Sequence, residues 1–163
     1  MFNYKTVFFT LGIILIVLGV SMLVPVFVQL YFNDFDSTFI ISSLITVTFG
    51  VLFFLSNMDH NHNINTQQAF LLTSLSWVGV AIFGSIPFFF SDMQLSFTDS
   101  FFESMSGITT TGSTIIPNLE IAQKSILLWR AMLQWLGGIG IIVMAITLMP
   151  IMNVGGMQLF KIS

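Results

Sequence analysis

Long apolar runs separated by short polar segments are the dominant pattern of this chain. Four runs are long enough to cross the hydrocarbon core of a bilayer, which takes about 20 apolar residues in a helix. They occupy residues 6–32, 39–56, 69–90 and 126–150. The first run follows one basic residue, Lys5, is longer than the apolar core of a signal peptide, and has no small-x-small cleavage site. The pattern therefore predicts an all-α integral membrane protein with four membrane spans, the first of them retained.

A fifth segment is too short to cross a membrane. Residues 97–108 would form a helix of about 18 Å, roughly half the thickness of the hydrocarbon core. Ser96 and Asp99 match the capping pattern of a helix start. The polar residues 109–114 follow, and non-helical backbone at membrane depth is tolerated only where protein or a water-filled cavity shields it. We predict a re-entrant helix that leads into a pore lining; a segment lying flat in the membrane interface is the alternative.

Composition supports a membrane protein and excludes several kinds of chemistry. Charged residues make up 7% of the chain and hydrophobic residues 55%, whereas soluble domains carry about 25% charged residues. Lipid must therefore cover most of the surface. The net charge of −3 does not indicate a charged partner such as nucleic acid. The chain has no cysteine, so disulfides, thiolate metal sites and cysteine nucleophiles are excluded.

The few basic residues give a predicted orientation. Lys5 and Lys161 lie at the two ends, whereas the loop at 33–38 carries two aspartates and no basic residue. Four spans and one re-entrant hairpin place both termini on the same side. The positive-inside rule makes that side cytoplasmic, although Lys124 then lies outside.

The re-entrant segment has the chemistry of a cation site. The C-terminal end of a helix carries partial negative charge and favours a cation. Gly112 permits backbone angles that a threonine resists, and Thr110 and Thr111 offer hydroxyl oxygens. Because rings of backbone carbonyls replace the hydration shell of potassium in ion filters, the pattern indicates a potassium pore.

Several motifs together resemble the TrkH/KtrB family of potassium transporters. The run Phe-Phe-Glu-Ser-Met-Ser-Gly-Ile-Thr-Thr-Thr-Gly-Ser-Thr at 101–114 is similar to that family's first pore loop. Motifs in the flanking helices resemble the same family in order and spacing: Gly-Ser-Ile-Pro-Phe at 84–88, Leu-Trp-Arg at 128–130, Gln-Trp-Leu-Gly-Gly-Ile-Gly at 134–140, Pro150, and Val-Gly-Gly-Met-Gln-Leu-Phe at 154–160. The resemblance covers roughly residues 67–163.

The resemblance implies a fold and a function. Residues 1–66 would form the helix pair and cytoplasmic loop that precede the first repeat. Residues 67–163 would form one helix–pore loop–helix repeat of a potassium channel-like pore, with its filter at 109–114. The ion-binding residues would be Thr110, Thr111, Gly112 and Ser113, with K⁺ at Thr110 and Thr111. Related plant transporters with serine at the position of Gly112 prefer sodium, so the glycine favours potassium.

The family also implies a cellular setting. Potassium would be the transported ion, and no cofactor is expected. The chain is not expected to be an enzyme. It would lie in a bacterial inner membrane, with a cytosolic nucleotide-binding regulatory subunit of the TrkA/KtrA kind as partner. The family has four repeats and this chain has one. It would therefore need the remaining repeats in the same polypeptide or other copies of itself, or be a truncated, non-transporting membrane fragment.

Two charged residues are candidates for filter support. Arg130 lies near the outer end of the last span, where an arginine is costly unless it is paired or reaches the interface. We expect it to pair with Glu103, with Glu120 or with carbonyls of the filter segment; simple snorkelling is the alternative. Asp92, Asp99, Glu103 and Glu120 would concentrate cations at the outer mouth, or be ordinary loop acids.

Several other features can be interpreted either as structural or as functional, and the structural interpretation is the simpler one. Glycines in the last span favour close helix packing over a gating hinge: Gly137, Gly138 and Gly140. Residues 59–62 include Asp59, His60 and His62 and form a polar turn more readily than a metal site. Ser106 and Gly107 resemble the nucleophile pair of an intramembrane serine protease, but no general base is expected near them.

Overall fold

The chain folds into a helical bundle, which we describe from a computed structural model covering residues 4–58, 66–120 and 122–151. Its helices in chain order are α1 (Tyr4–Ser21), α2 (Leu23–Tyr31), α3 (Thr38–Ser56), α4 (Thr66–Gly84), α5 (Ile86–Phe90), α6 (Phe97–Ile108) and α7 (Lys124–Ile151). No strand occurs in the described residues. The all-α prediction is confirmed.

Four stretches of the described chain are long and apolar enough to span a membrane. They are Tyr4–Tyr31, Thr38–Ser56, Gln67–Phe90 and Lys124–Ile146, which agrees closely with the four predicted spans. Between 22% and 39% of each span is buried inside the chain. Most of their apolar surface therefore has to be covered by lipid or by further protein.

Two of the predicted spans are each divided into two helices. Met22 separates α1 from α2, and Ser85 separates α4 from α5. Pro25 and Pro87 lie two or three residues beyond these breaks. A proline lacks the N–H that would bond the carbonyl one turn earlier, and its ring crowds that carbonyl. The prolines therefore explain why the hydrogen bonding of each span is interrupted at these points, although Met22 and Ser85 themselves keep helical backbone angles.

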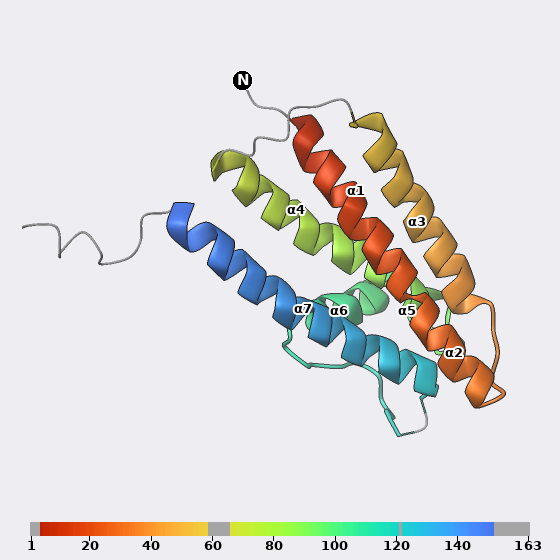
Figure 1. Ribbon diagram of the computed structural model, residues 1–163. Coiled ribbons are helices and arrows are strands. Elements are labelled where there is room, and N and C mark those ends of the chain that lie inside the picture. The colour runs from red at the N-terminus through yellow and green to blue at the C-terminus, as the bar shows by residue number, and fades with distance from the viewer. Residues whose placement is uncertain (1–3, 59–65, 121, 152–163) are drawn as a thin grey trace, which may run out of the picture.

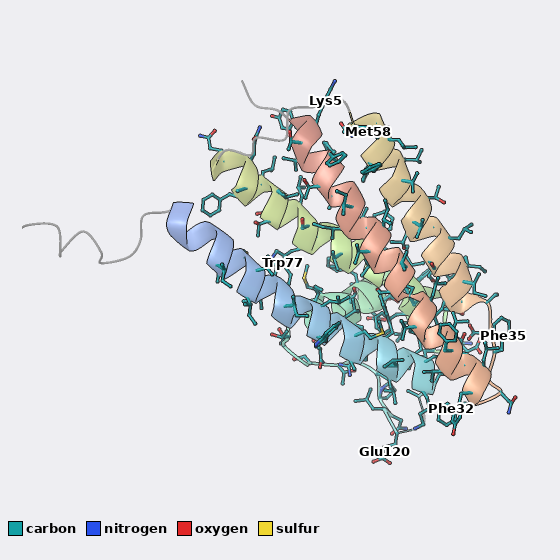
Figure 2. The ribbon with its side chains drawn as sticks, in the orientation of Figure 1. Lys5, Phe32, Phe35, Met58, Trp77 and Glu120 are labelled. Carbon is teal, nitrogen blue, oxygen red and sulfur yellow. The ribbon has the colours of Figure 1, made fainter. Side chains whose placement is uncertain are left out.

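The helices alternate in direction through the bundle (Figure 1). The start of α1, the end of α3, the start of α4 and the end of α7 lie at one end of the molecule. Figure 2 shows Lys5 and Met58 at this end, and Phe32, Phe35 and Glu120 at the opposite end. The arrangement agrees with the predicted even number of crossings, and the exposed Tyr31 at the end of α2 suits a membrane–water interface.

A polar contact at the second end joins the N-terminal helices to the rest of the chain. The amide of Gln29 and the backbone N–H of Thr38 both donate to Asp36 Oδ1, at 2.9 and 2.8 Å. The amide of Gln123, just before α7, approaches Asp36 Oδ2 at 3.5 Å. Asp36 therefore connects α2, α3 and the segment that leads into α7.

Glycines allow α1 and α3 to pack closely. A Cβ built at Gly12 would lie 2.6 Å from the backbone nitrogen of Phe54 and 2.7 Å from the carbonyl of Gly50. A Cβ at Gly50 would meet the backbone of Ile16 at 2.8 Å. Such small residues let helix backbones approach in the membrane, where van der Waals packing drives association.

Substitution of Gly12 by alanine is expected to separate these two helices. Overpacking of this kind lowers the free energy of unfolding by about 1–3 kcal/mol. The thermal denaturation midpoint in detergent measures the effect. Gly79→Ala is the matched control, because its Cβ would meet only the end of the Leu11 side chain, at 3.2 Å. Equal midpoints for the two variants would contradict the close-packing interpretation.

Candidate functional site

The short helix α6 begins with the capping box that the sequence predicts. The backbone N–H of Asp99 donates to the Ser96 hydroxyl at 3.1 Å, and the Asp99 carboxylate accepts from the Ser96 N–H at 3.3 Å. These bonds satisfy two backbone donors at the helix start. The bounds of α6, Phe97–Ile108, equal the predicted ones.

Glycines hold α6 against its neighbours on two sides. A Cβ at Gly84 of α4 would lie 2.6 Å from the hydroxyl oxygen of Ser104. On the other side, a Cβ at Gly137 of α7 would overlap the carbonyl of Ile108, the last residue of α6. The prediction of close packing is thus confirmed for Gly137, whereas Gly138 and Gly140 have no such neighbour in the described chain.

The C-terminal end of α6 is closed by backbone hydrogen bonds. The N–H of Thr110 donates to the carbonyl of Gly107 at 2.9 Å, and the N–H of Thr111 donates to that of Ser106 at 3.0 Å. This is the Schellman arrangement, which normally places glycine in the left-handed conformation. Here Thr110 takes that place with a φ of 58°. A β-branched residue in this region is strained, a condition typical of functional sites.

Gly112 provides the second left-handed position, with a φ of 78°. The atom closest to a Cβ built there is the amide nitrogen of Gln134, at 4.0 Å. Backbone conformation rather than lack of space therefore requires glycine at this position, as the sequence predicts. After α6 the chain returns beside α7 to reach the start of that helix (Figure 1).

A buried carboxylate lies behind the returning segment. Glu103 has no exposed surface. Its Oε1 accepts from the Thr114 hydroxyl and from the backbone N–H of Ile115, both at 2.6 Å. Its Oε2 accepts from Arg130 Nε at 2.8 Å, which completes an ion pair. A buried carboxylate needs such partners because an uncompensated charge is costly at this depth.

Arg130 links α7 to the returning segment. It is 9% exposed, and one of its terminal nitrogens lies 3.4 Å from the carbonyl oxygen of Ser113. The structure thus brings together Arg130, Glu103 and a carbonyl of the predicted filter segment, and it does not pair Arg130 with Glu120. The same Ser113 carbonyl accepts the hydroxyl of Ser106 at 2.6 Å.

The predicted ion-binding residues lie together on the surface of this chain. Thr110, Thr111, Gly112 and Ser113 are all exposed, as are the neighbouring residues 109 and 114. A shallow hollow of about 170 Å³ lies beside them, lined by Phe102, Met105, Ser106, Thr109, Thr111 and Ser113. The partial negative end of α6 points into this region of the chain.

The acidic residues proposed for an outer mouth do not form one group. Asp92 and Glu120 are exposed, and Figure 2 shows Glu120 at the end of the molecule opposite Lys5. The Asp99 carboxylate bonds the backbone at the start of α6. Because Glu103 is buried and paired with Arg130, the expectation that it attracts cations at the mouth is wrong. Asp59, His60, His62 and the 154–160 motif lie outside the described residues.

Two interactions of the site were not expected from the sequence. Ser106 was considered only as a nucleophile, yet its hydroxyl bonds the Ser113 carbonyl, seven residues further along. Trp129 is fully buried, and its indole N–H donates to the carbonyl of Gly84 at 2.9 Å. The Gly-Ser-Ile-Pro-Phe motif at 84–88 and the Leu-Trp-Arg motif at 128–130 include Gly84 and Trp129, but neither motif identifies the atoms that bond each other.

The fold and this site define a class of protein. The chain is a multi-pass integral membrane protein, in which a half-length helix and a returning polar segment lie among membrane-spanning helices. The family model of TrkH, described as a cation transport protein, matches residues 35–162. The chain belongs to the TrkH family.

Individual relatives agree with this assignment. The chain is 36% identical over 161 residues to the Trk system potassium uptake protein TrkH of Vibrio parahaemolyticus, covering 98% of this chain and 33% of that protein. It is 39% identical over 153 residues to TrkH of Halomonas elongata, covering 93% and 32%. Its fold matches the crystal structure of the potassium transporter TrkH from Vibrio parahaemolyticus with a TM-score of 0.88 and 35% identity, over 96% of this chain and 34% of that one.

The chain spans about a third of the length of the curated relatives it matches. These relatives are named as transport proteins and not as enzymes, in agreement with the prediction that the chain has no catalytic function.

The Glu103–Arg130 ion pair gives a prediction about stability. Glu103→Ala is expected to lower the free energy of unfolding by about 3–5 kcal/mol, because it leaves an uncompensated charge. Adding Arg130→Ala should recover part of that loss. Denaturation of the four members of this double-mutant cycle in mixed detergents measures the coupling. Additive losses would contradict a direct ion pair between the two residues.

Proposed function

We propose that this chain supplies one filter segment of a membrane pore that takes up potassium. In this proposal the backbone carbonyls of Thr110, Thr111 and Gly112 contact the dehydrated ion, and the Ser113 carbonyl, which accepts from Ser106 and Arg130, bounds the site at its outer end. The observation that carries it is the exposure of residues 109–114, a polar and non-helical segment beside the end of a half-length helix. Backbone of this kind is stable within a bilayer only where it lines a cavity or contacts other protein.

The local geometry supports an ion site more than a simple loop. Two left-handed residues, Thr110 and Gly112, flank Thr111 and change the direction of successive carbonyl groups. Side chains of Glu103 and Arg130 bond residues 113–115. Within the described part of the chain, no side chain bonds the backbone carbonyls of residues 110–112. A fixed outer end and available carbonyls are what a cation filter requires.

The rest of the pore has to come from other protein. We infer that further filter segments, in the same polypeptide or in other copies of this chain, surround the ion; we call this assembly the complete transporter. The names of the relatives as potassium uptake proteins support potassium as the transported ion. A bacterial inner membrane location, cytoplasmic termini and a cytosolic nucleotide-binding regulatory subunit belong to the same proposal.

Potassium uptake by cells that lack their own uptake systems tests this proposal. The chain is produced alone, and also joined to the following two-thirds of the Vibrio parahaemolyticus relative. Growth at low potassium and uptake of ⁸⁶Rb⁺ are expected from the joined protein. Uptake by the chain alone would show that copies assemble. No uptake from either protein, with normal membrane insertion, would overturn the proposal.

Substitution of Gly112 tests the role of the filter backbone. In Gly112→Ser the residue must keep a φ of 78° or move its carbonyl. A side chain in the left-handed region costs about 1–2 kcal/mol, so we expect the ratio of K⁺ to Na⁺ uptake to fall about tenfold. Gly79→Ser is the control for insertion and expression. An unchanged ratio in Gly112→Ser would exclude this glycine from the ion pathway.

Substitutions of Arg130 test whether this residue supports the filter segment. Arg130→Ala in the complete transporter is expected to abolish uptake, because it leaves Glu103 and the Ser113 carbonyl without their shared donor. Arg130→Lys should restore only part of the activity, since an ammonium lacks the planar fork that reaches two acceptors. Membrane levels are measured by immunoblot. Normal uptake by a well-inserted Arg130→Ala variant would refute the supporting role.

A further inference from the structure

The hydroxyl of Ser106 has a partner unlike that of most hydroxyls in these helices. Serine and threonine in a helix commonly bond the carbonyl one turn earlier. In α6 and just after it, Ser100 bonds the carbonyl of Ser96 and Thr109 bonds that of Met105. Ser106 instead donates to the carbonyl of Ser113, at 2.6 Å and seven residues further along the chain. Tertiary structure, not helix geometry, therefore directs this hydroxyl.

The backbone of the same residue contacts the other part of the segment. The Ser106 carbonyl accepts the N–H of Thr111 at 3.0 Å and that of Gly112 at 3.4 Å. Ser106 thus bonds three consecutive residues, 111, 112 and 113. It is 5% exposed and belongs to the last turn of α6, so these bonds fix the segment to a rigid element.

The Ser113 carbonyl has a second donor in Arg130, at 3.4 Å. A carbonyl oxygen has two lone pairs, and both are directed towards protein donors in this arrangement. The hydroxyl of Ser106 makes the shorter of the two contacts. Its loss would let this carbonyl rotate and would free a lone pair at the outer end of the segment.

We propose that Ser106 is a positioning residue that sets the selectivity of the filter segment by holding the Ser113 carbonyl. This inference rests on the proposed potassium uptake function and adds a specific determinant to it. With the hydroxyl in place, the carbonyl is held back towards α6 and the ion site keeps the width that suits a larger cation. Without it, the carbonyl can approach a smaller ion, and discrimination against sodium falls, whether size or carbonyl field strength governs selectivity.

A matched control lies on the same helix. Ser104 is also a buried serine of α6, and its hydroxyl oxygen has no hydrogen-bond partner within the described chain. Ser104→Ala therefore removes the same atom from the same helix without removing a bond to the filter segment. Ser106→Thr keeps a hydroxyl at the proposed position.

The experiment compares these two variants with Ser106→Ala in the complete transporter, reconstituted in vesicles. Uptake of K⁺ and Na⁺ is measured separately, with total uptake and protein content as further readouts. Ser106→Ala is expected to lower the K⁺ to Na⁺ ratio about fivefold, the effect of one lost hydrogen bond of ordinary strength. Ser106→Thr and Ser104→Ala should keep the ratio of the unsubstituted protein.

Other outcomes would overturn the inference. An unchanged ratio in Ser106→Ala would show that the hydroxyl does not determine selectivity. An equal fall in Ser104→Ala or in Ser106→Thr would indicate a general packing effect. Failure of the unsubstituted complete transporter to take up K⁺ would instead count against the proposed function itself, so the two failures are distinguishable.

Discussion

The buried carboxylate of Glu103 is the constraint on which the arrangement of the site depends. A charge without exposed surface requires several polar partners, and Glu103 obtains them from three places: Arg130 on α7, the Thr114 hydroxyl and the Ile115 N–H. These partners join α6, the returning segment and α7. The position of the segment is therefore set by the need to satisfy one charge.

Close packing around glycines complements this polar contact. Gly84 of α4 and Gly137 of α7 leave no room for a Cβ beside α6, so the short helix lies directly against both neighbours. Gly107 faces Leu133, where a Cβ would lie 3.0 Å from the leucine Cβ. Because the end of α6 is fixed at this distance, the strained φ of Thr110 can be maintained by its surroundings.

The surface of the chain includes an exposed polar segment that a bilayer alone would not accommodate. Residues 109–114 are exposed beside apolar spans whose surface is less than half buried. In the proposed function, further filter segments cover this surface; the TrkH family membership of the chain and the one-third of its relatives' length that it spans are consistent with that proposal. In this proposal the potassium site forms only when this segment assembles with further filter segments. Ser106 and Arg130 would position the segment through their bonds to the Ser113 carbonyl.

The sequence by itself determined the class of protein and most of its elements. Apolar runs longer than a bilayer requires fix the four spans, and the Ser96–Asp99 pattern fixes the start of α6, because both signals are local. The sequence also limited the partners of Arg130 to a few candidates, one of which was Glu103. Tertiary structure alone decided that Glu103 is buried and paired with Arg130, that Ser106 bonds Ser113, and that Thr110 takes a left-handed conformation. Each of these depends on atoms brought together from different elements, and no local pattern specifies such a distance.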